Sequence, residues 1–524
     1  MRRMLPRDGS WPDNIDVLKS MLTDQMACAE SLADKNIQLQ AENQYVKTQV
    51  LLLQEKLNLA LAQRYAARSE QYSPDQIRLF CEAEVDGRED VTPDSDTPSV
   101  IIAAHTRQKR GRKPLPDHLP RLEVIHDLPE AERYCDHDGA PLSPIGAVIS
   151  EQLDIVPATI RVIRHIRRQY ACGCGQCLKT APLPAQPIPK SLASPGLLAH
   201  VVVCKYVDAL PLYRQERILQ RIGVDIPRAT LANWMMEAGT LIQPLINLLR
   251  DRLLAYDIIQ MDETTVQVLK EPGKTAQSKS YLWLQRGGPP DRPVLLYDYD
   301  PGRGAGVPKR LLEGFQGALQ TDGYDGYNAA VAVGNLTHLG CLAHARRKFD
   351  EAIKAQGQQP RHGQAHHALA WIQKLYGVEK AVRHTTPAAR YAYRLQHAQP
   401  ILAELRTWLD ETLPQAPPQS AIGKALHYLH REWAKLIRYL NDGRFEIDNN
   451  RAENAIRPFV IGRKNWLFSD SVRGVKASAN LYSLIETAKA NGLEPYAYLR
   501  RVFTELPRAD TVEAVEALLP GNIQ

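Results

Sequence analysis

Three acidic residues stand in short motifs that suit metal-dependent chemistry. Asp262 follows the run I-I-Q-M, Asp322 follows A-L-Q-T, and Glu453 lies within D-N-N-R-A-E-N. The first two runs are typical of strands and the third of a short helix, so the three acids can converge in space. Hard divalent cations such as Mg²⁺ take oxygen ligands from few carboxylates. Two such ions can activate a water or a 3′-hydroxyl for in-line phosphoryl displacement. The motifs therefore indicate nuclease or strand-transfer chemistry.

The pattern between the first two acids is that of a compact α/β core. Alternating apolar residues and turn signals predict four strands and a short helix, at residues 258–268, 281–285, 294–299, 318–321 and 309–312 respectively. Asp322 precedes Gly323, so capping a turn is an alternative explanation for this acid. Glu263, Asp325 and Asp448 lie near the three acids in sequence and are the residues most easily confused with them.

The gap before the third acid is long enough for an inserted helical domain, which we expect at residues 349–445. Its tryptophans, Trp371, Trp408 and Trp433, fall on helical patterns and are expected in its core. Pro458 cannot donate the helical hydrogen bond, so the helix that carries Glu453 should kink or end near it.

Four segments resemble the DDE transposases of the insertion-sequence-66 family: M-D-E-T-T, T-D-G-Y, C-L-A-H-A-R-R-K-F and D-N-N-R-A-E-N-A-I-R-P-F-V-I-G-R-K-N-W-L-F. The similarity extends from the N-terminal helix to about Leu499. It implies that Asp262, Asp322 and Glu453 are a catalytic triad that holds two Mg²⁺ (or Mn²⁺) ions on a ribonuclease-H-like fold. It also implies small accessory proteins encoded by the same element. Cys341 and His344 match a motif found between the second and third acids of several such enzymes, and we expect them to support the active site.

Composition limits the classes that remain. An excess of +6 over 524 residues is too small to indicate nucleic-acid binding without local clustering. A hydrophobic content of 44% with 24% charged residues is that of a soluble globular protein of several domains. Eight unevenly spread cysteines do not form a disulfide framework and suggest a reducing compartment. With no long apolar run, we expect a cytoplasmic protein that acts at the nucleoid and has no membrane partner.

The N-terminal region predicts a coiled coil followed by a linker. Residues 15–60 keep a heptad in which Asn36 and Asn43 are the polar seam positions that fix register, which favours a parallel homodimer or a higher oligomer. A long helix packed on its own chain is the alternative. The acidic, Pro-rich linker ends in R-Q-K-R-G-R-K, where Arg110, Arg112 and Lys113 suit an arm that enters a minor groove. A solvated basic linker explains the same residues.

Two further modules precede the core. Cys135, His137, Cys174 and Cys177 have the paired spacing of a zinc site, although Asp138 stands where the family has its second cysteine. Free thiols are the alternative. After this module, a helix at residues 213–222, a turn at Gly223 and a second helix after Pro227 suit a helix-turn-helix. Its DNA contacts would be Arg228, Thr230 and Asn233, and a helical hairpin packed on the core is the alternative.

The sequence thus predicts a multidomain α+β protein in which a ribonuclease-H-like α/β core with a helical insertion follows a coiled coil, a zinc-finger-like module and a helical region. The expected divisions are residues 1–68 (coiled coil), 69–120 (linker and basic arm), 121–185 (zinc-finger-like module), 186–250 (helix-turn-helix-like region), 251–348 (core), 349–445 (insertion), 446–490 (core with Glu453) and 491–524 (C-terminal segment). Further contacts to double-stranded DNA, at the transposon ends and the target, are expected from Arg346, Arg347, Lys348, Arg457, Arg463 and Lys464.

The expected function is that of a DNA transposase, which binds element ends and catalyses Mg²⁺-dependent cleavage and strand transfer. Two alternatives come from other classes. A non-catalytic dimeric DNA-binding regulator, or an inactive transposase remnant, would use the basic segments without the acids. A glycosidase would use two carboxylates without metal or basic clusters.

Overall fold

The computed structural model describes residues 14–65, 160–171, 178–182, 184–356 and 363–523. The chain divides into two units, Met1–Asp86 with Pro184–Gln524, and Gly87–Leu183. In the second unit, β1 (Gln169–Ala171) and β2 (Leu178–Thr180) form an antiparallel ribbon. The first unit contains every element that positions the three acids.

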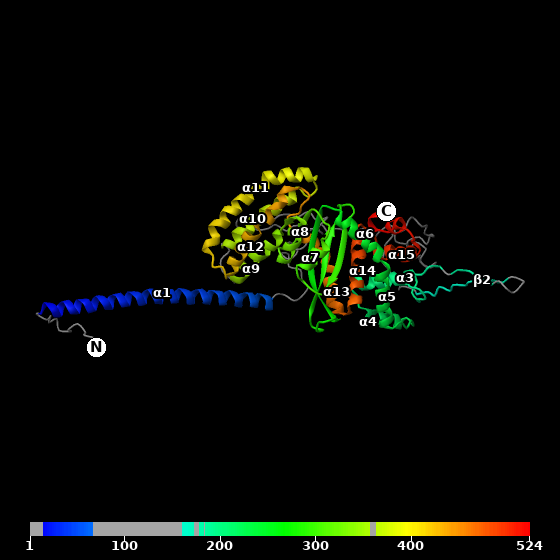
Figure 1. Ribbon diagram of the computed structural model, residues 1–524, viewed down its shortest axis with the longest axis horizontal. Helices are drawn as coiled ribbons and strands as arrows, with labels where there is room; N and C mark the ends of the chain where they lie inside the picture. The colour runs from blue at the N-terminus through cyan, green and yellow to red at the C-terminus, as the bar shows by residue number, and fades with distance from the viewer. Residues whose placement is uncertain (1–13, 66–159, 172–177, 183, 357–362, 524) are drawn as a thin grey trace, which may run out of the picture. The chain divides into compact units, whose positions relative to one another are not determined.

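A six-stranded mixed sheet forms the centre of the first unit (Figure 1). Its order is β5-β4-β3-β6-β7, and β8 pairs with the far end of β3. β4 runs antiparallel to both of its neighbours, β3 and β5, whereas β6 and β7 run parallel to β3. The strands are β3 (Ile258–Lys270), β4 (Lys279–Gly287), β5 (Val294–Asp300), β6 (Ala318–Gln320), β7 (Thr337–Leu339) and β8 (Ser469–Ser471). The four expected strands and the expected short helix, α7 (Gly306–Leu311), are confirmed.

Helices that precede the strands along the chain, and helices that follow them, pack against this sheet. Within one hydrophobic cluster, α13 packs on β3, and α14 packs on β5 and α5. The helices that contribute to this cluster include α3 (Pro195–Tyr206), α4 (Leu212–Arg221), α5 (Arg228–Leu241), α6 (Gln243–Leu254), α8 (Asn328–Gly334), α13 (Asn450–Trp466), α14 (Val472–Ala490), α15 (Pro495–Glu505) and α16 (Val512–Glu516). The expected helix, turn and helix are present as α4, the turn at Gly223 and α5. Gly223 takes a φ of 82°, which glycine adopts readily.

Of the two outcomes expected at Pro458, a kink or an end of the Glu453 helix, the end is wrong. The helix α13 continues past this residue to Trp466. Proline in a helix costs about 3 kcal/mol through its missing amide and its ring. Phe459 and Gly462, which follow it, are buried in the hydrophobic cluster, and this packing holds the last two turns in helical conformation.

Four helices between β7 and α13 form a separate cluster with its own core. They are α9 (Leu342–Gln356), α10 (Gln364–Ala381), α11 (Pro387–Thr412) and α12 (Ala421–Leu436). Trp371, Trp408 and Trp433 pack against this core, as expected. Short 3-10 turns complete the described chain at Asp325–Tyr327, Leu413–Gln415, Ile437–Asn441, Leu506–Arg508 and Pro520–Asn522.

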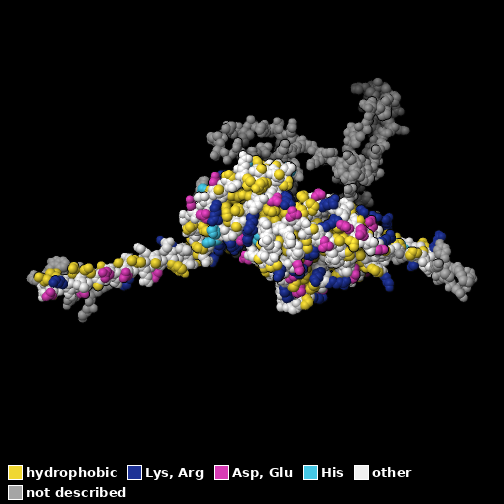
Figure 2. All heavy atoms as spheres, turned by 45° about the horizontal axis from the view of Figure 1, so that its top comes forward, with side chains coloured by type: hydrophobic (Ala, Val, Ile, Leu, Met, Phe, Trp, Pro, Cys, Tyr) yellow, Lys and Arg dark blue, Asp and Glu magenta, His cyan; other side chains and the backbone are white. Residues whose placement is uncertain are grey.

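The N-terminal helix α1 (Ile15–Tyr65) is one continuous element, which confirms the helix expected there. Figure 2 shows hydrophobic side chains along it, and seam residues such as Leu22, Leu32 and Leu39 are 65%, 58% and 55% exposed. Its C-terminal turns contact the helical cluster, where Asn58 donates to the carbonyl of Ala355 at 2.9 Å. Among the described helices, none combines the length and the apolar character needed to cross a bilayer.

Candidate active site

The register of two parallel strands brings the first two acids together. Gln260 of β3 pairs with Gln320 of β6, and their side chains share a buried hydrogen bond of 2.9 Å. Asp262 and Asp322 each follow two residues later, so they lie side by side, Asp262 within β3 and Asp322 just beyond the end of β6. Asp322 also accepts a hydrogen bond from the amide of Tyr324 at 2.9 Å, after Gly323 with a φ of 91°. The turn-capping role is therefore real and uses one carboxylate oxygen, Oδ1.

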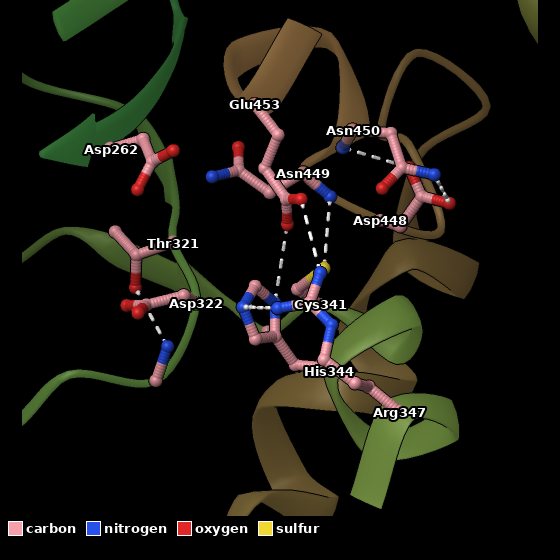
Figure 3. A network of polar contacts seen from close by, with 12 residues as sticks. Asp262, Thr321, Asp322, Cys341, His344, Arg347, Asp448, Asn449, Asn450 and Glu453 are labelled. Carbon is pink, nitrogen blue, oxygen red and sulfur yellow. Dashed lines mark hydrogen bonds and ion pairs between the residues drawn. The ribbon is translucent and has the colours of Figure 1, made fainter. Parts of the chain in front are cut away.

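The third acid comes from the first turn of α13, which is fixed to the strand of the first acid. Asn449 precedes the helix, and its carbonyl accepts from the amide of Glu453 at 3.1 Å. The Asn449 side chain donates to the carbonyl of Met261, next to Asp262, at 2.8 Å. Figure 3 shows Glu453 facing the two aspartates, with its carboxylate turned toward His344. The three acids expected from the sequence are thus gathered in one place.

The charges of these acids act on one another. Burial raises the pKa of Asp262 well above its ordinary value, and the carboxylates of Glu263, Glu453 and Asp322 raise it further. Such repulsion between carboxylates is what a bound cation relieves. Oxygen donors in a partly buried cluster with this excess of negative charge fit a hard divalent ion such as Mg²⁺ or Mn²⁺.

The neighbouring acids that could be confused with the three are held in other contacts. Glu263, with a side chain only 2% exposed, accepts from Arg303 at 2.8 Å and from the hydroxyl of Tyr327 at 2.6 Å. Asp448 accepts from Tyr376 at 2.7 Å and from the side chain of Asn450 at 2.9 Å. The third, Asp325, is exposed.

A histidine and an arginine from α9 lie against the carboxylate of Glu453 (Figure 3). His344 Nδ1 lies 3.5 Å from Oε1, and Arg347 Nη2 lies 3.3 Å from Oε2. Arg347 Nη1 also lies 3.3 Å from His344 Nε2. Because a guanidinium can only donate, Nε2 must accept, and the ring proton is on Nδ1, facing Glu453. Burial lowers the pKa of His344, which favours this neutral form.

Cys341, His344 and Glu453 also have the composition of a transition-metal site, since their ligand atoms lie within 4.8 Å of one another. Two features oppose that function. Burial raises the pKa of the Cys341 thiol well above its ordinary value, so the thiolate that a metal requires is disfavoured. Arg347 lies 3.3 Å from both His344 Nε2 and Glu453 Oε2, so these two ligand atoms already have a partner. The arrangement therefore suits positioning of Glu453 better than metal binding.

The residues expected to contact DNA lie in varied surroundings. On α5, Arg228 and Asn233 are exposed and Thr230 is half-buried; on α9, Arg346 is half-buried and Lys348 is exposed. On α13, Arg457 is half-buried and Lys464 is exposed, whereas Arg463 donates to the hydroxyls of Thr264 and Thr265 at 3.2 and 3.1 Å. The remaining sites, Arg110, Arg112, Lys113, Cys135, His137, Cys174 and Cys177, lie outside the described residues.

Sequence reasoning missed Asn449 as a residue of the site. The available signal was its place before the helix, since asparagine is favoured at that position. Its side chain, however, makes no capping bond and points to β3 instead. Arg347 was expected at a DNA phosphate, and its partner in the structure is Glu453.

Comparison with known proteins shows which family the chain belongs to. Residues 190–477 match the family described as "Transposase IS66 family", and residues 483–520 match the "IS66 C-terminal element". Residues 132–175 match the "zinc-finger binding domain of transposase IS66", and residues 52–124 match "Transposase C of IS166 homeodomain". The protein is therefore a transposase by family, and the chain belongs to the IS66 transposase family.

Similar proteins occur in Sinorhizobium fredii (strain NBRC 101917 / NGR234). "Uncharacterized protein y4qI" is 32% identical over 98% of both chains. "Uncharacterized protein y4jD" is 35% identical over 82% of this chain and 88% of its own. The similarity to the first of these relatives thus extends into the N-terminal region.

Proposed function

We propose that this protein is a DNA transposase that cuts the ends of its element and joins the freed 3′ ends to target DNA, with Mg²⁺ or Mn²⁺ held by Asp262, Asp322 and Glu453. The observation that carries the proposal is the convergence of these carboxylates from two parallel strands and one helix. Family membership supports the same reaction class. A glycosidase, the alternative, requires only two carboxylates and does not explain a cluster of more acids that repel one another.

The core is proposed to be ribonuclease-H-like. Its support is the strand order β5-β4-β3-β6-β7, in which three antiparallel strands are followed by two parallel ones. The first acid lies on the first strand of this core and the second follows its fourth strand. The third lies on a helix packed on the first strand.

The chain's own residues have distinct roles in this proposal. Two bound ions would activate the nucleophile and stabilise the leaving oxygen. His344 and Arg347 hold the Glu453 carboxylate, and Cys341 anchors the helix that carries them. Exposed cations such as Lys348 and Lys464 contact DNA phosphates. No covalent protein–DNA intermediate is needed, because water and the 3′-hydroxyl are the nucleophiles.

The regions before the core are proposed to assemble the complex. The exposed seam of α1 supports a parallel coiled coil that joins two copies and hence two DNA ends. The family match at residues 132–175 supports a zinc module, with Cys135, His137, Cys174 and Cys177 as its ligands. Accessory proteins of the same element are further proposed partners. Stoichiometric zinc in the purified protein, lost in Cys174→Ser, would support the module; absence of zinc would reject it.

The test is cleavage of end-labelled duplexes that contain the element's ends. The wild-type protein should nick them with Mg²⁺ and not with EDTA. Glu453→Gln should bind the duplex and not cut it, while Asp325→Asn, an exposed acid nearby, should cut as the wild type does. DNA binding without cleavage in every case, with accessory proteins supplied, would reject the enzyme and favour a DNA-binding regulator.

A further inference from the structure

One buried asparagine links the three segments that build the candidate active site. Asn449 is fully buried. Its side chain Nδ2 donates to the carbonyl of Met261 on β3 at 2.8 Å, and its backbone amide donates to the sulfur of Cys341 at 3.2 Å. Its carbonyl accepts from the amides of Ala452 and Glu453 at 3.0 and 3.1 Å. Each of these bonds ends on a residue of the site or next to it.

The bond to Met261 fixes the orientation of the peptide that joins it to Asp262. In a strand, the plane of each peptide determines where the next side chain points. At the other end, the two bonds to the Asn449 carbonyl begin the helix and determine where Glu453 projects. One residue therefore sets the separation between the first acid and the third.

The bond to Cys341 connects Asn449 to the segment that carries His344, the residue that lies against Glu453. The carbonyl of Cys341 accepts from the amide of His344 at 3.2 Å, and His344 lies against Glu453. The amide of Leu342 also donates to the carbonyl of Ile447, two residues before Asn449, at 3.2 Å. The start of α9 and the start of α13 are thus held together by a small network centred on Asn449.

We infer that Asn449 is a positioning residue, which holds Asp262 and Glu453 at the separation that divalent metal binding requires. The inference rests on the proposed function, because it concerns the same metal site. Mg²⁺ demands near-ideal octahedral geometry, and more adaptable ions tolerate displaced ligands better. Residues that orient metal ligands through hydrogen bonds typically change metal affinity by about 10–100-fold when they are removed.

A matched control exists in Asn491. Its Nδ2 donates to the carbonyls of Pro293 at 2.9 Å and Thr487 at 2.7 Å, before the start of β5 and near the end of α14, in the same compact unit. Like Asn449, it has a side-chain oxygen that is buried without a hydrogen-bond partner among the described residues. Asn491→Ala therefore removes a comparable structural bond without touching the site.

The experiment measures Mn²⁺ affinity of the full-length protein by the electron paramagnetic resonance signal of the free ion. Glu453→Gln defines the Mn²⁺ that binds elsewhere. Asn449→Ala should weaken Mn²⁺ binding about 10–100-fold, whereas Asn491→Ala should stay within about twofold at a similar loss of thermal stability. Asn449→Leu keeps a similar side-chain volume, loses the donor and adds no charge, so it should weaken binding as well and serves if the alanine variant does not fold.

A second readout separates positioning from a general loss of stability. The ratio of Mn²⁺-supported to Mg²⁺-supported DNA cleavage should rise in the Asn449 variants and not in Asn491→Ala. Wild-type affinity and an unchanged ratio in both Asn449 variants would overturn the inference and leave the proposed function standing. Failure of the wild-type protein to bind Mn²⁺ at the acids would reject the proposed metal chemistry, and the inference with it.

Discussion

Replacing Arg394 should loosen the connection between the helical insertion and the helix of Glu453. This arginine on α11 is 0% exposed. It makes a two-pronged ion pair with Glu379, at 2.8 and 2.7 Å. It also donates to the carbonyls of Tyr439, Asp442 and Phe445 at 2.9, 3.0 and 2.9 Å. Those three residues belong to the segment that leads back to the core.

The magnitude follows from what Arg394→Met leaves behind. Removing one partner of a buried ion pair costs about 3–5 kcal/mol, because the other charge stays buried without compensation. Glu379 is 15% exposed and can regain some water, so we expect the lower end, about 3 kcal/mol. This free energy corresponds to an about 10²-fold larger equilibrium constant for local opening, and hence to about 10²-fold faster hydrogen exchange.

Hydrogen–deuterium exchange of peptides from residues 437–449 measures this opening directly. Arg390→Met is the control, since Arg390 lies one turn earlier and donates to the carbonyl of Arg383 near the surface. Its exchange should change little. The double change Arg394→Met with Glu379→Met should recover part of the protection, because no buried charge remains while the carbonyls of Tyr439, Asp442 and Phe445 still lack their donor. Unchanged exchange in Arg394→Met, or no recovery in the double variant, would refute the reasoning.

Three further predictions concern the site, its stability and the assembly. His344→Ala should lower DNA cleavage about 10–100-fold, because a contact that orients a metal ligand is lost. Lys348→Ala should lower cleavage less. Equal effects of the two changes in a cleavage assay would contradict this prediction. Burial lowers the pKa of His338 from 6.5 to about 4. The unfolded chain therefore binds the proton first, and stability present above pH 6.5 should be lost toward pH 4 by up to about 3 kcal/mol. As the pH is lowered from 6.5 to 4, the thermal midpoint should fall less steeply in His338→Gln than in the wild-type protein. An equally steep fall in both would contradict the assignment. Leu32→Asp with Leu39→Asp should convert an α1-linked dimer to monomers in light scattering, whereas a wild-type monomer would reject the coiled coil.

The strands that carry the acids could be predicted from the sequence because local pattern determines them. Apolar runs bounded by turn residues identified β3 and β6, and Gly223 with Pro227 identified the turn between two helices. The strands β7 (T-H-L) and β8 (S-D-S) have one apolar residue and none, so no apolar run marks them in the sequence. Whether α13 passes Pro458 depends on packing that no local pattern encodes.

The contacts within the site were less predictable than its acids. Asp262, Asp322 and Glu453 could be selected because their motifs resemble a known family. Asn449 acts through a carbonyl almost two hundred residues away in sequence, and its side-chain direction follows from tertiary packing alone. Arg347 is one cation among three neighbours on α9, and only the folded structure distinguishes the one that contacts Glu453.

The most direct test of the central claim, that the three acids form one divalent-metal site, is affinity cleavage with iron. Fe²⁺ would replace Mg²⁺ at the carboxylates, and ascorbate with peroxide would generate radicals that cut the nearby peptide chain. The claim predicts cuts close to residues 262, 322 and 453, suppressed together by excess Mg²⁺ and by Glu453→Gln. Cuts at only one of these positions, or cuts that Glu453→Gln leaves unchanged, would contradict it.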